Sequence, residues 1–431
     1  MASKTEKTLE RTREDIAVYS SIVEMMELAP GEMNHLYIPT MKNMIRQSER
    51  TIECIETGEP FAASCFTNPA EIFTSMDLHW YFLFKQSFAG GLPNPHMTED
   101  LEALDHMGVP SDVCTLIRLA LHYLDARLVP KPTVYLGITE PCDGIVGVHE
   151  AIRTHPDWHD VPSWGPDLIY WHDDESLAYF AGEIRDMVRF LVEYTGKPFD
   201  LDRLREVIAE SNKQYGLWHE HSELKRAVPC PHRYMMSMQC FYQTNFEGGG
   251  RKENTGWFED LVADAEMRVK ENRPEAPNQK IRLLWFDIPP VWFEELFGWL
   301  EEEWGAVIVM DMVSYCPYTP IDTRDEETIF KGFARRVLMD PPMVRQARGY
   351  ADNFLSDITR IVRDYRIDCV IWPGHIGHKD GAASISLMRE RCRELDVPFL
   401  HIGMDQFDKR YMTPDEVKTK ISQFFNAMGL G

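Results

Sequence analysis

The fold class is decided by residues 367–425, which read IDCVIWPGHIGHKDGAASISLMRERCRELDVPFLHIGMDQFDKRYMTPDEVKTKISQFF. Their first apolar run, 369–372, predicts a buried strand that leads into a turn rich in glycine and histidine. A helix, a second strand at 399–403 and a last amphipathic helix complete an alternation that is typical of a parallel α/β sheet. Open α/β sheets bind ligands at the carboxyl ends of their strands, so the turn containing His375 and His378 is the first candidate for chemistry.

Turn signals and composition divide the chain into segments. The turn at 58–60 ends a run of helical pattern, and the polar run at 271–280 reads as a linker before three further apolar strands. A polar, glycine-rich loop is expected at 246–256, with helix resuming at 257. The predicted segments are a helical N-terminal lead (1–57), a first α/β domain (58–175), a helical middle segment (176–275) and a C-terminal α/β domain (276–431). The expected fold class is therefore α/β, with two Rossmann- or flavodoxin-like parallel-sheet domains.

The composition is that of an ordinary globular protein. With 431 residues, 44% of them apolar, the chain can bury the core of two or three domains. The formal net charge of −24 opposes binding to a polyanion, so nucleic acid is not an expected partner. The charged start MASKTEKTLERTRED reads as neither a signal peptide nor a membrane anchor, and no run approaches the roughly 18 apolar residues of a transmembrane helix. A cytoplasmic protein without a membrane partner is expected.

The nine cysteines are an odd number, and in a cytoplasmic chain of this size they are expected to be thiols. None of them forms a CxxC pair, so a metal site would have to be assembled from distant segments. The cysteines are Cys54, Cys65, Cys114, Cys142, Cys230, Cys240, Cys316, Cys369 and Cys392.

Two of these cysteines fall where a helix is predicted to begin. In GVPSDVCTLIRLALHYL, Ser111 and Asp112 are candidate N-caps, which would place Cys114 in the first helical turn. Cys142 follows a predicted strand at 133–138 and precedes a helix. Helix N-termini favour a thiolate. Because both cysteines lie at equivalent positions at the start of a predicted helix, their thiols could converge on one crevice. The alternative is that both are small core residues, as free cysteines usually are.

Three other polar residues have both a functional and an ordinary interpretation. His375 and His378 lie three apart across a glycine-containing turn, so both imidazoles could face one ligand or could simply stabilise the turn. Ser64 ends the first predicted strand, where its hydroxyl could face the same crevice as Cys142 or be an ordinary polar strand end.

The region before the last helix carries capping signals. Asp405 and Asp408 follow a strand and could serve as caps, and capping is the favoured role of Asp408. Thr413, with Pro414 next and Glu416 three residues on, predicts a capping box at the start of the final helix. These features are structural.

Several common catalytic motifs are absent. The sequence contains no GxGxxG after a strand, no GxxxxGK[ST] and no GxSxG. ATP hydrolysis by this chain itself is therefore not expected.

The order of five segments resembles a known family. They are NPAEIF, PSDVCTLIRLAL, GITEPCDG, IRLLWFDIPP and the C-terminal VIWPGHIGHKDG with VPFLHIGMDQFDKRYMTPDEVKTKISQF. Together they resemble the 2-hydroxyacyl-CoA dehydratase and benzoyl-CoA reductase family over most of residues 58–428. The resemblance is best to the larger, alpha-type subunit of the two homologous subunits.

This resemblance implies a heteromeric, oxygen-sensitive enzyme of anaerobic metabolism with a [4Fe-4S] cluster. It also implies a homologous smaller subunit, an ATP-dependent iron–sulfur activator protein that delivers single electrons, and an acyl-CoA substrate. The family's cluster cysteines fall on Cys114 and Cys142, whereas the third falls on His378. Histidine can replace thiolate and raises the reduction potential, so milder electron chemistry is expected. Ser64 aligns with a hydroxyl-bearing stretch near the cluster and is carried over as a substrate contact.

Three hypotheses follow. The first is an iron–sulfur subunit whose one-electron chemistry either removes water from a 2-hydroxyacyl-CoA or reduces an aromatic acyl-CoA. The second, motivated by the missing third cysteine, is a cluster-free structural or acyl-CoA-binding subunit whose partner carries the catalysis. The third is a mononuclear metal site at His375 and His378 with a nearby carboxylate.

Overall fold

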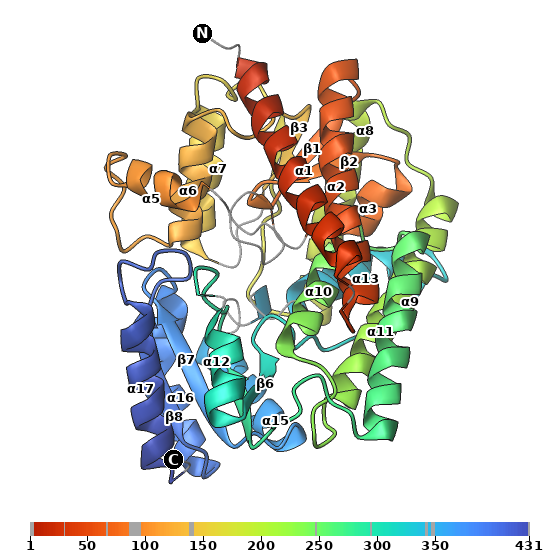
Figure 1. Ribbon diagram of the computed structural model, residues 1–431. Helices are drawn as coiled ribbons and strands as arrows, with labels where there is room; N and C mark the ends of the chain where they lie inside the picture. The colour runs from red at the N-terminus through yellow and green to blue at the C-terminus, as the bar shows by residue number, and fades with distance from the viewer. Residues whose placement is uncertain are drawn as a thin grey trace.

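Two parallel β-sheets organise the protein. The computed structural model describes residues 4–29, 31–65, 68–85, 96–137, 142–245, 248–293, 295–340, 344–345 and 350–429. In these residues the chain forms two four-stranded sheets and 15 helices (Figure 1). Every strand pair in both sheets is parallel. The predicted α/β class with two parallel sheets is confirmed. Within the described ranges, no helix combines the length and apolar character needed to cross a membrane.

The first sheet lies in the upper half of Figure 1 and has the strand order β2-β1-β3-β4. Its strands are β1 (Phe61–Ser64), β2 (His79–Phe82), β3 (Val134–Leu136) and β4 (Ser163–Trp164). The helices before and between them are α1 (Lys4–Leu28), α2 (Asn34–Thr57), α3 (Ala70–Ser75), α5 (Met97–Leu104), α6 (Thr115–Asp125) and α7 (Asp143–Thr154). Residues of the first three strands are buried, as expected for a parallel sheet that is covered on both faces.

The second sheet lies in the lower half of Figure 1 and has the order β6-β5-β7-β8. Its strands are β5 (Ile281–Trp285), β6 (Ala306–Asp311), β7 (Cys369–His375) and β8 (Phe399–Met404). Helices α12 (Glu295–Trp304) and α17 (Pro414–Ala427) cover one face, and α15 (Tyr350–Asp364) and α16 (Lys379–Glu394) cover the other. Neighbouring residues of β5 point to opposite faces: Leu283 packs with the first pair of helices and Leu284 with the second.

The middle of the chain is helical, and it joins the two sheets. Its helices are α8 (Asp174–Thr195), α9 (Leu201–Leu224), α10 (Tyr234–Asn245) and α11 (Lys252–Glu271). Helix α11 begins within the stretch 246–256 that was expected to be loop, because Arg251 is its N-cap. Helix α13 (Glu326–Met339) lies between β6 and β7 in the sequence, yet its apolar side packs in the same core as α8 and the first sheet. The four-segment division itself remains a prediction.

The predicted capping box at the last helix is confirmed. Thr413 is the N-cap of α17, its side chain accepts from the backbone N–H of Glu416, and the Glu416 carboxylate accepts from the N–H of Thr413. Pro414 occupies the first helical position, where a missing N–H costs nothing.

Candidate functional site

Three helix N-termini carry the cysteines and histidine that the sequence singled out. Cys114 is the N-cap of α6, Cys142 is the N-cap of α7 and His378 is the N-cap of α16. None of the three N-cap residues makes a side-chain capping hydrogen bond. We call Cys114 and Cys142 the thiol wall, and His375 and His378 the imidazole wall.

The prediction that Ser111 or Asp112 caps helix α6 is wrong, since Cys114 itself is the N-cap and lies one residue before the first turn. Both residues contact the C-terminal part of the chain. The Tyr411 hydroxyl donates a hydrogen bond to the Ser111 carbonyl, and the Lys379 ammonium lies 3.2 Å from an Asp112 carboxylate oxygen.

The two walls touch. A Cβ atom added at Gly377 would lie 2.1 Å from the Cα atom of Cys114, so only glycine permits this approach of the two backbones. His378 hydrogen-bonds the Cys114 side chain as well. The turn that joins β7 to α16 is therefore packed directly against the start of α6.

Cys142 lies within electrostatic range of the other two residues. Burial, together with the neighbouring Cys114, raises its pKa to about 11, although the backbone N–H of Ile145 and the nearby His378 oppose the rise. Cys114 and Cys142 are each partly exposed, unlike most of the other cysteines. The structure therefore brings Cys114, Cys142 and His378 together. Their role as ligands of a metal cluster remains a prediction.

A buried carboxylate fixes the orientation of His378. Nδ1 of His378 lies 3.1 and 3.2 Å from the two carboxylate oxygens of Asp287, whose side chain is only 3% exposed. Burial alone would lower the pKa of His378, but the charge and hydrogen bond of Asp287, together with Cys114, raise this pKa well above its ordinary value. Burial alone would raise the pKa of Asp287, yet the two histidines of the imidazole wall lower it.

Asp287 was not among the predicted site residues. It follows strand β5 by two residues, at the carboxyl edge of the second sheet, and the quoted segment IRLLWFDIPP contains it. An acidic residue directly after an apolar strand of a parallel sheet was the signal that could have identified it.

His375 has a structural partner. It is the last residue of β7, and its Nε2 donates a 2.6 Å hydrogen bond to the carbonyl of Ile288. Its ring lies 5.1 Å from that of His378 at an angle of 78°, and burial lowers its pKa. Through the Ile288 hydrogen bond, His375 ties β7 to the segment after β5. Among the described residues, no group of three or more His, Cys, Asp or Glu side chains is arranged to hold a metal ion.

Asp405 and Asp408 also differ from their expected capping role. Asp405 accepts a 2.9 Å hydrogen bond from the hydroxyl of Thr115, directly after Cys114, and its other oxygen accepts from the backbone N–H of Phe407 and of Asp408. Asp408 accepts from the backbone and the guanidinium of Arg410 and does not cap a helix. The strand β8 to α17 connection therefore contacts the start of α6.

Ser64 lies at the carboxyl end of β1 and is 2% exposed. Its hydroxyl donates to the carbonyl of Cys65, 3.2 Å away, and accepts a 2.9 Å hydrogen bond from the amide of Asn68. These partners belong to its own segment, so its role as a substrate contact stays a prediction. Residues 138–141, which join the predicted strand to Cys142, lie outside the described residues.

Comparisons with known proteins bear on this arrangement. The family model described as 2-hydroxyglutaryl-CoA dehydratase, D-component, matches residues 65–428. The chain belongs to this family. Among curated relatives, it is 21% identical over 317 residues to the alpha subunit of (R)-2-hydroxyglutaryl-CoA dehydratase from Acidaminococcus fermentans, covering 72% of this chain and 63% of that protein. It is 23% identical over 193 residues to the alpha subunit of (R)-phenyllactyl-CoA dehydratase from Clostridium sporogenes, covering 42% of this chain and 46% of that protein. The match thus spans less than two thirds of either relative. The resemblance inferred from the sequence is confirmed at the level of the family.

Proposed function

We propose that this chain is the alpha-type subunit of a heteromeric 2-hydroxyacyl-CoA dehydratase and that Cys114, Cys142 and His378 hold a [4Fe-4S] cluster. The observation that carries the proposal is the convergence of two thiols and one imidazole from three separate helix N-termini. When bound, such a cluster would supply one-electron chemistry and an open iron as a Lewis acid for the thioester carbonyl or the leaving hydroxyl.

Thiol and imidazole donors suit that group chemically, although the described residues are not arranged as a metal site. Thiolates are the usual cluster ligands, and imidazole replaces them in some clusters. In metal sites the second nitrogen of a ligand histidine commonly donates to a carboxylate, which is the relation of His378 Nδ1 to Asp287. This contact leaves Nε2 as the nitrogen available on the side of Cys114.

Loading the site requires the loss of protons. Burial holds the pKa of Cys142 at about 11 and Asp287 raises that of His378, so both side chains are protonated near neutral pH before a metal binds. Iron binding would have to displace these protons, which makes affinity fall as the pH falls. The positive ends of helices α6 and α7 offset part of that cost at the two thiolates.

The remaining parts of the assignment follow from the relatives. Both are dehydratase alpha subunits, so we favour removal of water from a 2-hydroxyacyl-CoA over reduction of an aromatic acyl-CoA. A homologous smaller subunit and an ATP-dependent iron–sulfur activator would complete the enzyme, in the cytoplasm. Ser64, at the carboxyl end of β1, would contact the substrate.

The test is iron and sulfide analysis with electron paramagnetic resonance of anaerobically purified protein. We expect a cluster signal in the native chain and its loss in Cys114→Ser and in Cys142→Ser. Cys316→Ser is the matched control, because Cys316 is also partly exposed. Iron-free native protein without a cluster signal would contradict the proposal.

A second candidate function is a cluster-free, acyl-CoA-binding subunit. Its support is the His378–Asp287 pair, which satisfies both charges without a metal. The variant His378→Cys separates the two: a cluster that appears only in this variant favours the cluster-free subunit, whereas a cluster already present in the native chain excludes it.

A further inference from the structure

The start of α6 is held against the C-terminal part of the chain by a set of polar contacts around Arg410. One guanidinium nitrogen of Arg410 lies 2.6 Å from Asp105, and another lies 2.6 Å from Asp408. The second of these nitrogens also donates to the carbonyl of Leu101, 3.4 Å away. Arg410 thus links the end of α5 to the connection between β8 and α17.

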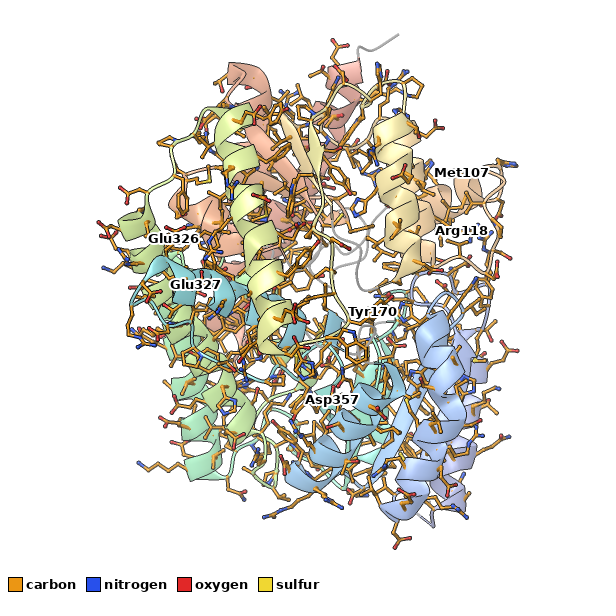
Figure 2. All side chains as sticks on the ribbon, turned by 180° about the vertical axis from the view of Figure 1, so that it is seen from behind. Met107, Arg118, Tyr170, Glu326, Glu327 and Asp357 are labelled. Carbon is orange, nitrogen blue, oxygen red and sulfur yellow. The ribbon has the colours of Figure 1, made fainter. Side chains whose placement is uncertain are left out.

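These contacts surround the segment that carries Cys114. This segment comprises residues 105–115. In Figure 2, Met107 of this segment and Arg118, which follows it in α6, lie above the helices of the second sheet. Arg118 lies 3.9 Å from the Asp105 carboxylate oxygen that a guanidinium nitrogen of Arg410 also contacts, at 3.3 Å. Tyr411, next to Arg410, donates to the carbonyl of Ser111.

Arg410 and Asp408 are suited to holding position. The Asp408 side chain is 2% exposed, and it receives hydrogen bonds from both the backbone and the guanidinium of Arg410. This local pairing orders the guanidinium, so less conformational entropy is lost when it also binds Asp105. Because its guanidinium group is already ordered by Asp408, Arg410 can hold two parts of the chain at a fixed distance.

We propose that Arg410 is a positioning residue, which holds residues 105–115 on the C-terminal part of the chain and so keeps Cys114 against His378. The consequence for a cluster rests on the proposed function, but the positioning itself concerns only this chain. Without Arg410, the Thr115–Asp405 and Tyr411–Ser111 hydrogen bonds and the exposed Lys379–Asp112 pair remain.

The test measures the alkylation rate of individual thiols in the full-length, chelator-treated protein under anaerobic conditions, with N-ethylmaleimide and peptide mass spectrometry. In Arg410→Gln we expect Cys114 to react about fivefold faster, the population change typical of losing one well-ordered ion pair. Cys316 serves as the reference thiol in the same sample and should not change. Arg410→Lys keeps the charge without the fork, so its rate should lie between those of native protein and Arg410→Gln.

Arg324→Gln is the matched control, because Arg324 forms a comparable exposed pair with Asp322 at 2.6 Å and lies far along the chain from the site. An unchanged Cys114 rate in both Arg410→Gln and Asp105→Asn would overturn the proposal. Should Arg410→Gln unfold, which reaction of the fully buried Cys240 would reveal, Asp105→Asn alone decides the question.

A second readout separates this proposal from the proposed function. In protein loaded with iron, Arg410→Gln should shift the electron paramagnetic resonance signal. It should also make a chelator remove the iron faster. If native protein holds no iron, the cluster proposal fails while the alkylation rates still decide the role of Arg410.

Discussion

The thiol wall and the imidazole wall are built in different ways. His375 and His378 are fixed by buried partners from their own sheet, the carbonyl of Ile288 and the carboxylate of Asp287. Among the described residues, no carboxylate hydrogen-bonds either of the two cysteines in this way. The imidazole wall is thus fixed within its own sheet, whereas the segment that carries Cys114 is held by contacts with the C-terminal part of the chain.

The support behind the first sheet comes from α13. Arg336 on this helix binds Glu71 at the start of α3 and donates a 2.9 Å hydrogen bond to Ser211 on α9. Glu71 is 3% and Arg336 5% exposed, so the pair is removed from water. Helix α13 belongs in sequence to the second sheet, and this pair anchors it in the first.

The largest expected effect is on this anchor. Arg336→Met leaves the carboxylate of Glu71 buried and unpaired, which should lower the free energy of unfolding by about 3–5 kcal/mol. The measurement is denaturant unfolding. Glu327→Gln is the control, because Glu327, also on α13, pairs with Arg185 of α8 at the surface, where Figure 2 labels it, and should cost less than about 1 kcal/mol. Equal losses of unfolding free energy in the two variants would show that burial of the Arg336–Glu71 pair adds nothing to stability.

The next effect is a pH dependence near the same anchor. Burial raises the pKa of Asp340, at the end of α13, to about 7, with Arg336 opposing the rise. The folded state therefore holds a proton that the unfolded state releases, so stability falls as pH rises from about 4 to 7 and then levels off. The full shift corresponds to at most about 4 kcal/mol.

Asp340→Asn, which cannot ionise, should remove that slope and be more stable than native protein at pH 8 but not at pH 4.5. The measurement is the difference in unfolding free energy between the two proteins at each pH. A difference that does not change with pH would mean that Asp340 is not protonated in the folded state.

A smaller effect is expected at the imidazole wall. Asp287→Asn removes the charge that orients His378, and loss of such a partner typically lowers metal affinity by about 10–100-fold. Iron retention against a chelator measures it. Asp311→Asn is the matched control, since Asp311 is an equally buried carboxylate at the end of β6 that binds Ser314 instead. Should both variants retain iron equally well, Asp287 does not support the site.

The smallest effect is expected at the start of α17. Thr413→Ala removes the capping box and should cost about 1 kcal/mol of stability without changing iron retention. Thr413→Ser keeps the hydroxyl and should restore stability. A large loss of iron in Thr413→Ala would instead show that α17 supports the site.

The sequence predicted the regular parts of the fold well because they depend on local pattern. The apolar runs of the second sheet and the capping box at Thr413 are both visible within a few residues. The start of α11 was misplaced because Lys252–Gly256 is polar, and that pattern resembles a loop.

The support of the site was not predictable in the same way. Arg410 and Asp105 are 305 positions apart, and Arg336 and Glu71 are 265 apart, so no local pattern pairs them. The sequence alone did identify Cys114, Cys142 and His378 as candidate site residues. The glycine at 377 that lets two backbones approach could be understood only once the fold was known.

The central claim is that Cys114, Cys142 and His378 share one inorganic centre. Anomalous diffraction at the iron edge, from crystals of the complex grown without oxygen, tests it most directly. We expect an anomalous peak within bonding distance of the two sulfur atoms and of His378 Nε2. A peak confined to the partner subunit, with Asp287 and His378 paired and no iron beside the thiols, would contradict it.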